Sequence, residues 1–271
     1  MSEGTIGLIA GGGRLPLLIA EKARQSGRRV AAVGFASNTD PELARNCSEF
    51  VWLKLGQLSG LIRFLQQNNV QEAVLAGSID KPRALDIRPD FRAAKLLWGM
   101  DKKGDDSLLR AVAGELEKEG IKIGSCLEIV PELRVPEGQL TSRAPARPEK
   151  KDIQYGREVL GSIGSLDIGQ SIVVYEQMIV AVEAVEGTNA AILRAGELLH
   201  KRGGTIIKGA KPGQDLRFDQ PALGPQTIET MHTAGLSCLA FCARTCIFFQ
   251  PEKSKQLADS YGMSILGLPG I

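Results

Sequence analysis

The densest group of side chains that could do chemistry lies between Thr205 and Thr227, where glycines and prolines interrupt the chain. Five charged residues fall within twelve positions there: Lys208, Lys211, Asp215, Arg217 and Asp219. Lysine ammonium groups neutralise phosphate oxygens, and a carboxylate holds Mg²⁺ or activates a water molecule. Phosphoryl-group hydrolysis needs both functions, so this stretch is a candidate catalytic site. A solvated charged loop would have the same composition.

A second candidate is the pair Glu183 and Glu186, which flank the end of an expected strand and are followed by Gly187-Thr188-Asn189. The backbone N–H groups and the hydroxyl of a Gly-Thr pair at a helix start favour an anion. The alternative is that Thr188 is simply the N-cap of the helix.

The third candidate is the loop Gly11-Gly12-Gly13, which follows a strand and precedes a helix. Glycines in such a loop allow backbone N–H groups to approach an anion. The loop matches neither the GxGxxG nor the Walker pattern, so a nicotinamide cofactor or a nucleoside triphosphate is poorly supported. A tight strand-to-helix turn explains the glycines equally well.

Two further groups have simpler explanations. The run Lys102–Ser107 could contact a phosphate or a metal, but a capped, solvated helix start is favoured. The cysteines Cys238, Cys242 and Cys246 are spaced by four, yet the local sequence predicts short strands that would separate their thiols. Buried structural thiols are therefore favoured over a zinc site.

The elements that must position these residues alternate between strands and helices. The first half predicts strands at 5–10, 30–34, 51–53 and 73–76 and helices at 15–26, 58–67, 91–98 and 105–120. The second half predicts helices at 153–163, 190–201, 225–233 and 252–261 and strands at 171–175, 178–185, 205–209, 237–241, 246–249 and 264–266. This pattern indicates an α/β protein with a Rossmann-like parallel sheet in residues 1–135 and a catalytic mixed α/β domain in residues 151–271. The aperiodic, Pro- and Arg-rich stretch 136–150 is expected to be an exposed linker.

The composition is that of an ordinary globular protein, with 43% apolar and 24% charged residues. The net charge of +2 gives no reason to expect nucleic-acid binding. No apolar run approaches the roughly 20 residues needed to cross a bilayer, and the N-terminus has no signal-peptide pattern, so we expect a cytoplasmic protein. Five cysteines in such a chain make a disulfide framework unexpected.

Several motifs in this order resemble those of one family. They are GLIAGGGRLP at 7–16, AGSIDKPR at 76–83, KGDDSLLR at 103–110, LDIGQSIVV at 166–174, AVEAVEGTNAAI at 181–192 and KPGQDLRFDQPALGPQTI at 211–228. The chain resembles, over nearly its whole length, the UDP-2,3-diacylglucosamine pyrophosphatases of lipid A biosynthesis that are unrelated to calcineurin-like phosphoesterases.

This resemblance implies an Mg²⁺-dependent hydrolase that releases UMP and 2,3-diacylglucosamine 1-phosphate. It implies Asp219 as the catalytic residue and Asp219, Glu183 and Glu186 as metal ligands. The substrate-binding residues that it implies are Gly11, Gly12, Gly13, Gly77, Gln170, Gly187, Thr188, Lys208, Lys211, Gln214 and Arg217. It further implies a homodimer and a nucleotide-activated diacyl sugar lipid as the substrate, bound between two domains. Because the diacyl product belongs in a membrane, we also expect a peripheral contact with the inner membrane.

Two other functions stay open at this point. A nucleotide-sugar binding protein without catalytic activity would use the same Rossmann-like scaffold. An NAD-dependent oxidoreductase would need an acidic residue at the end of the second strand, where Gly34-Phe35-Ala36 stands instead.

Overall fold

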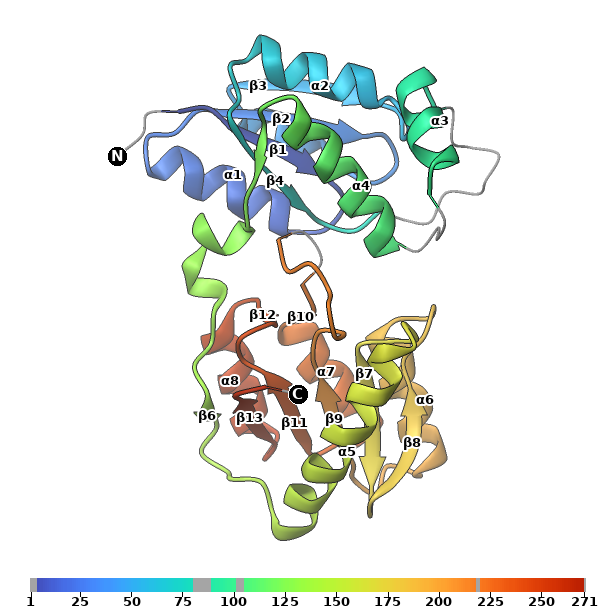
Figure 1. The fold of residues 1–271 in the computed structure, drawn as a ribbon. Helices are drawn as coiled ribbons and strands as arrows, with labels where there is room; N and C mark the ends of the chain where they lie inside the picture. Colours follow the sequence, from blue (N-terminus) through green and yellow to red (C-terminus); the bar gives the residue numbers. More distant parts are fainter. Residues whose placement is uncertain (1–3, 80–88, 101–104, 218–219, 271) are drawn as a thin grey trace. The chain divides into compact units, whose positions relative to one another are not determined.

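The structure is a computed structural model that describes residues 4–79, 89–100, 105–217 and 220–270 (Figure 1). It divides into two compact units. Unit 1 holds the described residues up to Pro131 together with Arg217, and unit 2 holds Glu132–Leu216 and the residues from Gln220 onward. Each unit has its own sheet and its own hydrophobic core, which confirms the predicted α/β class.

Unit 1 is built on a five-stranded sheet in the order β3-β2-β1-β4-β5, and all of its strands are parallel. The strands are β1 (Ile6–Ala10), β2 (Val30–Phe35), β3 (Glu49–Leu53), β4 (Glu72–Ala76) and β5 (Lys122–Ile123). This is the strand order of a Rossmann-type sheet, in which β2 and β3 are added on one side of β1 and β4 and β5 on the other. The Rossmann-like prediction is therefore confirmed.

Helices cover both faces of this sheet. They are α1 (Leu15–Gln25), α2 (Leu58–Gln67), α3 (Phe91–Trp98) and α4 (Asp105–Lys118), with 3-10 turns η1 (Pro41–Asn46), η2 (Cys126–Glu128) and η3 (Pro131–Leu133). One core cluster joins Ile9 of β1 to α2, α3 and α4. Successive strand residues face opposite sides, so the fully buried Ile6 and Leu8 face the side where α1 packs on β1 and β2.

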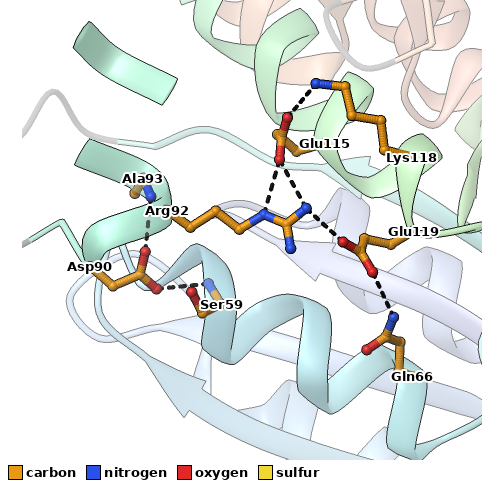
Figure 2. Close-up of polar contacts among 8 residues, drawn as sticks. All are labelled: Ser59, Gln66, Asp90, Arg92, Ala93, Glu115, Lys118 and Glu119. Carbon is orange, nitrogen blue, oxygen red and sulfur yellow. Dashed lines mark hydrogen bonds and ion pairs between the residues drawn. The ribbon is translucent and has the colours of Figure 1, made fainter. Parts of the chain in front are cut away.

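The orientation of α3 is fixed by two polar clusters, shown in Figure 2. Asp90 caps α3 by accepting a 2.9 Å hydrogen bond from the Ala93 N–H, and it also accepts a 2.7 Å bond from the N–H of Ser59 in α2. Burial would raise the pKa of Asp90, but the bonds from Ala93 and Ser59 outweigh it and lower that pKa. Arg92 pairs with Glu115 at 2.9 Å and with Glu119 at 2.7 Å, which ties α3 to α4.

Unit 2 is built on a six-stranded mixed sheet in the order β6-β13-β11-β9-β7-β8. Its strands are β6 (Gly138–Gln139), β7 (Ser171–Tyr175), β8 (Met178–Val182), β9 (Thr205–Lys208), β11 (Cys238–Cys242) and β13 (Ser264–Leu268). Strands β9, β11 and β13 are parallel, whereas β6 and β7 run antiparallel to their neighbours. A separate parallel pair joins β10 (Ala222–Leu223) to β12 (Ile247–Phe248).

Four helices enclose the sheet of unit 2: α5 (Arg147–Ser165), α6 (Thr188–Leu198), α7 (Pro225–Ala234) and α8 (Pro251–Ser260). One core cluster lies between α5 and the sheet. The other joins α6, α7 and α8 to the opposite face. The helix α6 corrects one prediction, because Gly187, with φ of 83°, precedes it and Thr188 is its first residue instead of its N-cap. None of the helices in the described part of the chain combines the length and apolarity that a bilayer crossing requires.

The stretch 136–150, expected as an exposed linker, is instead integrated into unit 2. It supplies β6, and α5 begins within it at Arg147. Arg143 donates two hydrogen bonds, of 2.8 and 2.9 Å, to the carboxylate of Glu149, and Ser237 donates a third of 2.6 Å. Such contacts leave no periodic pattern in the sequence, which is why the stretch resembles a linker. The division between the units falls between Pro131 and Glu132, whereas the sequence ended the first domain at residue 135.

The three clustered cysteines are buried and unpaired. Cys238 and Cys242 stand at the two ends of β11, and Cys246 lies just before β12. Burial raises the pKa of Cys238 and of Cys246 to about 12, which keeps both thiols protonated at neutral pH. Protonated, buried thiols are poor nucleophiles and poor metal ligands.

The Arg143–Glu149 pair predicts a large difference between two glutamate variants of unit 2. The side chain of Glu149 is only 10% exposed, so Glu149→Ala removes the carboxylate that pairs with the Arg143 guanidinium and should lower the free energy of unfolding by about 3 kcal/mol. Glu137 pairs with Arg244 at an exposed position, so Glu137→Ala should cost less than about 1 kcal/mol. Denaturant unfolding followed by circular dichroism measures the free energy of unfolding of both variants. Equal losses would show that the Arg143–Glu149 pair contributes no more than an exposed ion pair.

Candidate active site

A connected group of polar side chains in unit 2 surrounds Lys208, the last residue of β9. Lys208 is 4% exposed, and its Nζ donates a 2.5 Å hydrogen bond to Oγ1 of Thr188. The Thr188 hydroxyl donates in turn to Oε1 of Glu183 at 2.9 Å, and Ser171 donates to the other oxygen of that carboxylate. A buried cation is therefore linked to a carboxylate through one hydroxyl.

Strand register and glycine positions bring these four side chains together. Ser171 is the direct partner of Lys208 in the antiparallel pairing of β7 with β9. A Cβ atom at Gly169 would lie 1.9 Å from the carbonyl oxygen of Glu183, so only glycine allows the chain before β7 to pass this close to the end of β8. Thr188 enters from the first position of α6. We call Ser171, Glu183, Thr188 and Lys208 the Lys208 cluster.

The loop after β9 positions a second lysine. The ammonium group of Lys211 lies 2.5 Å from Asp167, whose side chain is 66% exposed. The side chain of Gln214 accepts a 2.8 Å hydrogen bond from the N–H of Lys211, and its own N–H returns to the Lys211 carbonyl at 3.1 Å. Gln214, predicted to bind substrate, thus shapes the turn that presents Lys211. The carbonyl of Gln170 holds the other side of this loop by accepting from Gly209 at 3.0 Å.

The contacts of Glu186 are with residues outside the Lys208 cluster. Its carboxylate pairs with Arg194 at 2.8 Å and accepts a 3.1 Å hydrogen bond from the N–H of Ala184. Hydrogen bonds from its own N–H and from Ala184, together with the Arg194 guanidinium, lower the pKa of Glu186. Within the described ranges, no group of three or more His, Cys, Asp or Glu side chains could hold a metal ion, and the metal-ligand role of Glu183 and Glu186 stays a prediction.

The glycine loop of unit 1 is closed by backbone hydrogen bonds to residues at the end of β4 and just after it. Gly11 donates to Ala76 at 2.8 Å, Gly12 donates to Ser78 at 2.6 Å, and Ser78 returns a 3.1 Å bond to Gly12. These bonds occupy the Gly11 and Gly12 N–H groups, which the sequence analysis assigned to an anion. A Cβ atom at Gly77 would lie 2.4 Å from the Gly12 carbonyl oxygen, so the glycines permit contact between two loops. Gly13, exposed and with φ of 87°, is the part of the loop directed to solvent.

Arg217 belongs to unit 1, whereas Lys208 and Lys211 belong to unit 2. Its guanidinium pairs with Glu117 of α4 at 2.6 Å, and both side chains are 40% exposed. Asp219, predicted as the catalytic residue and as a metal ligand, lies outside the described residues.

Sequence reasoning found Glu183, Thr188 and Lys208 but missed Ser171, Asp167 and Arg194. The missed residues stand 12, 44 and 8 positions from their partners, and the tertiary fold brings each pair together. A hollow of about 660 Å³ on α5 is lined by Lys150, Ile153, Gln154, Arg157, Glu158 and Leu266, and none of the predicted site residues contributes to it.

Comparison with known proteins decides the family. The LpxI N-terminal domain model matches residues 5–133, and the LpxI C-terminal domain model matches residues 136–266. The chain belongs to the LpxI family. A curated LpxI relative from Caulobacter vibrioides (strain ATCC 19089 / CIP 103742 / CB 15), named UDP-2,3-diacylglucosamine pyrophosphatase, is 35% identical over 273 residues, which cover 97% of each chain.

Solved structures resemble the LpxI chain only distantly. A biotin carboxylase complex with β-γ-ATP from Campylobacter jejuni is 11% identical, with a TM-score of 0.29 over 72% of this chain and 42% of that chain. An N5-carboxyaminoimidazole synthetase with ADP from Staphylococcus aureus is 22% identical, with a TM-score of 0.25 over 63% and 38%.

The closed glycine loop predicts the effect of adding a methyl group there. A Cβ atom at Gly11 would lie 2.4 Å from the carbonyl oxygen of Ser78, so Gly11→Ala should destabilise unit 1 by about 1–3 kcal/mol. At Gly114, inside α4, a Cβ atom would meet nothing within 4 Å. Gly114→Ala should therefore stabilise the protein by roughly 0.5–1 kcal/mol. Thermal unfolding of both variants measures this, and an unchanged stability for Gly11→Ala would refute the packing argument.

Proposed function

We propose that this chain hydrolyses the pyrophosphate of UDP-2,3-diacylglucosamine to UMP and 2,3-diacylglucosamine 1-phosphate in lipid A biosynthesis. The observation that carries the proposal is the match to a curated pyrophosphatase over 97% of both chains. Both LpxI domain models also match in the expected order.

The Lys208 cluster supplies charge stabilisation in this proposal. Water attacks one phosphorus, its oxygen forms a new P–O bond, and the bridging P–O bond breaks, so negative charge develops on phosphoryl oxygens. Lys208 donates to one of these oxygens. In this proposal Glu183, acting through the Thr188 hydroxyl, holds the Lys208 ammonium group in place.

The other predicted binding residues act within their own units. Lys211 exchanges the exposed Asp167 for a phosphate oxygen, which costs little because an exposed ion pair is weak. Gly187 and Thr188 offer the N-terminal N–H groups of α6, and Gly13 offers the exposed side of the glycine loop. Gly11, Gly12 and Gly77 shape that loop, while Gln170 and Gln214 shape the loop that carries Lys211. Arg217 contributes a further cation, and Asp219 orients the attacking water.

Mg²⁺ dependence is part of the proposal, with Asp219 as a protein ligand. The donor sets of Glu183 and Glu186 do not fit a dedicated cage, because each carboxylate already accepts hydrogen bonds from other groups. Mg²⁺ is commonly held by one or two carboxylates and the phosphates of a substrate. When bound in that way, the ion would neutralise charge on the pyrophosphate.

The proposal also includes where and with what the enzyme works. A cytoplasmic homodimer meets its diacyl sugar lipid at the inner membrane, since the acyl chains of the substrate belong in a bilayer. Sedimentation of the purified chain tests the dimer, and a strictly monomeric species would contradict it.

The first activity prediction concerns turnover and metal removal. The purified chain should release UMP from UDP-2,3-diacylglucosamine, and excess EDTA should abolish that release until Mg²⁺ is restored. Chromatographic detection of UMP measures both. Substrate binding without turnover under any divalent cation would favour a nucleotide-sugar binding protein, and full turnover in EDTA would remove Mg²⁺ from the proposal.

The second activity prediction concerns Asp219. Asp219→Ala should lower turnover by about 10²–10⁴-fold while leaving the melting temperature and substrate binding unchanged. An ionised carboxylate is suited to holding a water molecule or Mg²⁺. A purely structural partner of Arg217 would instead lower stability, although Arg217 already pairs with Glu117. Near-normal turnover in a well-folded variant would refute the assignment.

The third activity prediction separates Lys208 from its support. Lys208→Met should lower kcat by about 10²–10³-fold, because a charge donor at the phosphoryl oxygens is lost. Thr188→Val removes only the bridging hydroxyl and should have a smaller effect of the same kind. Lys253→Met, at an exposed position of α8, is the control and should keep normal turnover. Turnover of Lys208→Met within threefold of the control would contradict the role given to Lys208.

A further inference from the structure

Helix α3 presents two large aromatic side chains to solvent. Phe91 is 88% exposed and Trp98 is 93% exposed, the highest values among the large apolar residues described as exposed. Exposed apolar groups of this size mark surfaces that meet another apolar phase. No part of the catalytic proposal uses either residue.

The two aromatics lie on one face of the helix. At about 100° per residue, Phe91, Ala94, Lys95 and Trp98 fall within an arc of about 100°. All four are exposed. The opposite face holds Ala93, which is buried, and Leu96, which packs against the core of unit 1. We call the four exposed residues the α3 face.

The structure prevents α3 from turning this face inward. Asp90 fixes the start of the helix by capping α3 and binding Ser59 of α2 at the same time. Arg92 fixes the rotation of α3 about its own axis by pairing with Glu115 of α4 and with Glu119, which follows α4 (Figure 2). With Arg92 directed toward α4 and Ala93 into the core, Phe91 and Trp98 must point away from unit 1.

We propose that the α3 face docks on an anionic lipid surface, which would bring unit 1 to the membrane that holds the substrate. The inference rests on the proposed function, because the acyl chains of the substrate require a bilayer. Aromatic side chains favour the membrane–water interface, and a cation among them favours anionic headgroups. Lys95 is that cation, and it lies between Phe91 and Trp98 on the α3 face.

A second copy of the chain fits this face less well. In a two-fold symmetric contact through the same face, each residue meets its own copy or a near neighbour. The two Lys95 ammonium groups would then approach each other where water is excluded, with no carboxylate on the α3 face to balance them. A lipid surface provides anionic groups for Lys95 and an apolar layer for Phe91 and Trp98.

The fluorescence of Trp98 tests this directly. The chain has two tryptophans, so Trp52→Phe leaves Trp98 as the sole emitter. We expect its emission to shift to the blue and to be quenched by brominated acyl chains when vesicles of phosphatidylethanolamine and phosphatidylglycerol are added. Vesicles of phosphatidylcholine alone should have a weaker effect. An unchanged spectrum with anionic vesicles would overturn the proposal.

A variant of the face completes the test. Phe91→Ser/Trp98→Ser should weaken co-sedimentation with the anionic vesicles at least tenfold, whereas Met178→Ser/Leu198→Ser, at exposed apolar sites of unit 2, should not. The face variant should also lose turnover of substrate in vesicles yet keep turnover of a short-chain substrate in solution. If the unaltered chain does not turn over the short-chain substrate in solution, the proposed function is refuted instead. A change of oligomeric state with unchanged vesicle binding would overturn the docking proposal.

Discussion

The ammonium group of Lys208 sets the main constraint on unit 2, because a buried cation is stable only with a counter-charge and hydrogen-bond partners. The counter-charge is Glu183, and it reaches Lys208 through the hydroxyl of Thr188. This requirement explains why β7 pairs with β9 in the register that places Ser171 opposite Lys208. It also explains why glycine stands at position 169, since any side chain there would collide with the backbone of Glu183.

The spacing of apolar residues along the sequence predicted where the longer elements lie. Helices α2 and α3 were predicted with their observed bounds, because their apolar residues recur at helical spacing and Asn68 and Gly99 follow their last residues. Strands β5, β6 and β10 have two residues each, too few to show any alternation. Glu149 was hidden for a related reason. It stands in a Pro- and Arg-rich stretch, and its burial depends on Arg143 and Ser237.

The sequence predicted several residues of the candidate site, but it did not predict which of them are hydrogen-bonded to one another. Lys208, Thr188 and Glu183 were found because lysines, a Gly-Thr pair and carboxylates gather near strand ends. Their connection as one hydrogen-bonded group depends on strand register, which sequence patterns do not report. The glycine loop shows the opposite case. Its glycines suggested an open anion cradle, but the close approach they permit is to the backbone of Gly77 and Ser78.

Because Arg217 belongs to unit 1, one contact of this unit can form only late in the synthesis of the chain. The chain leaves unit 1 after Pro131, forms four of the six strands of the main sheet of unit 2, and returns to unit 1 at Arg217. The partner of Arg217 is Glu117, which was synthesised 100 residues earlier. Domains fold as units while the ribosome elongates the chain. Unit 1 therefore emerges with its sheet complete but with Glu117 unpaired, and it acquires this last ion pair only after β9 has been translated.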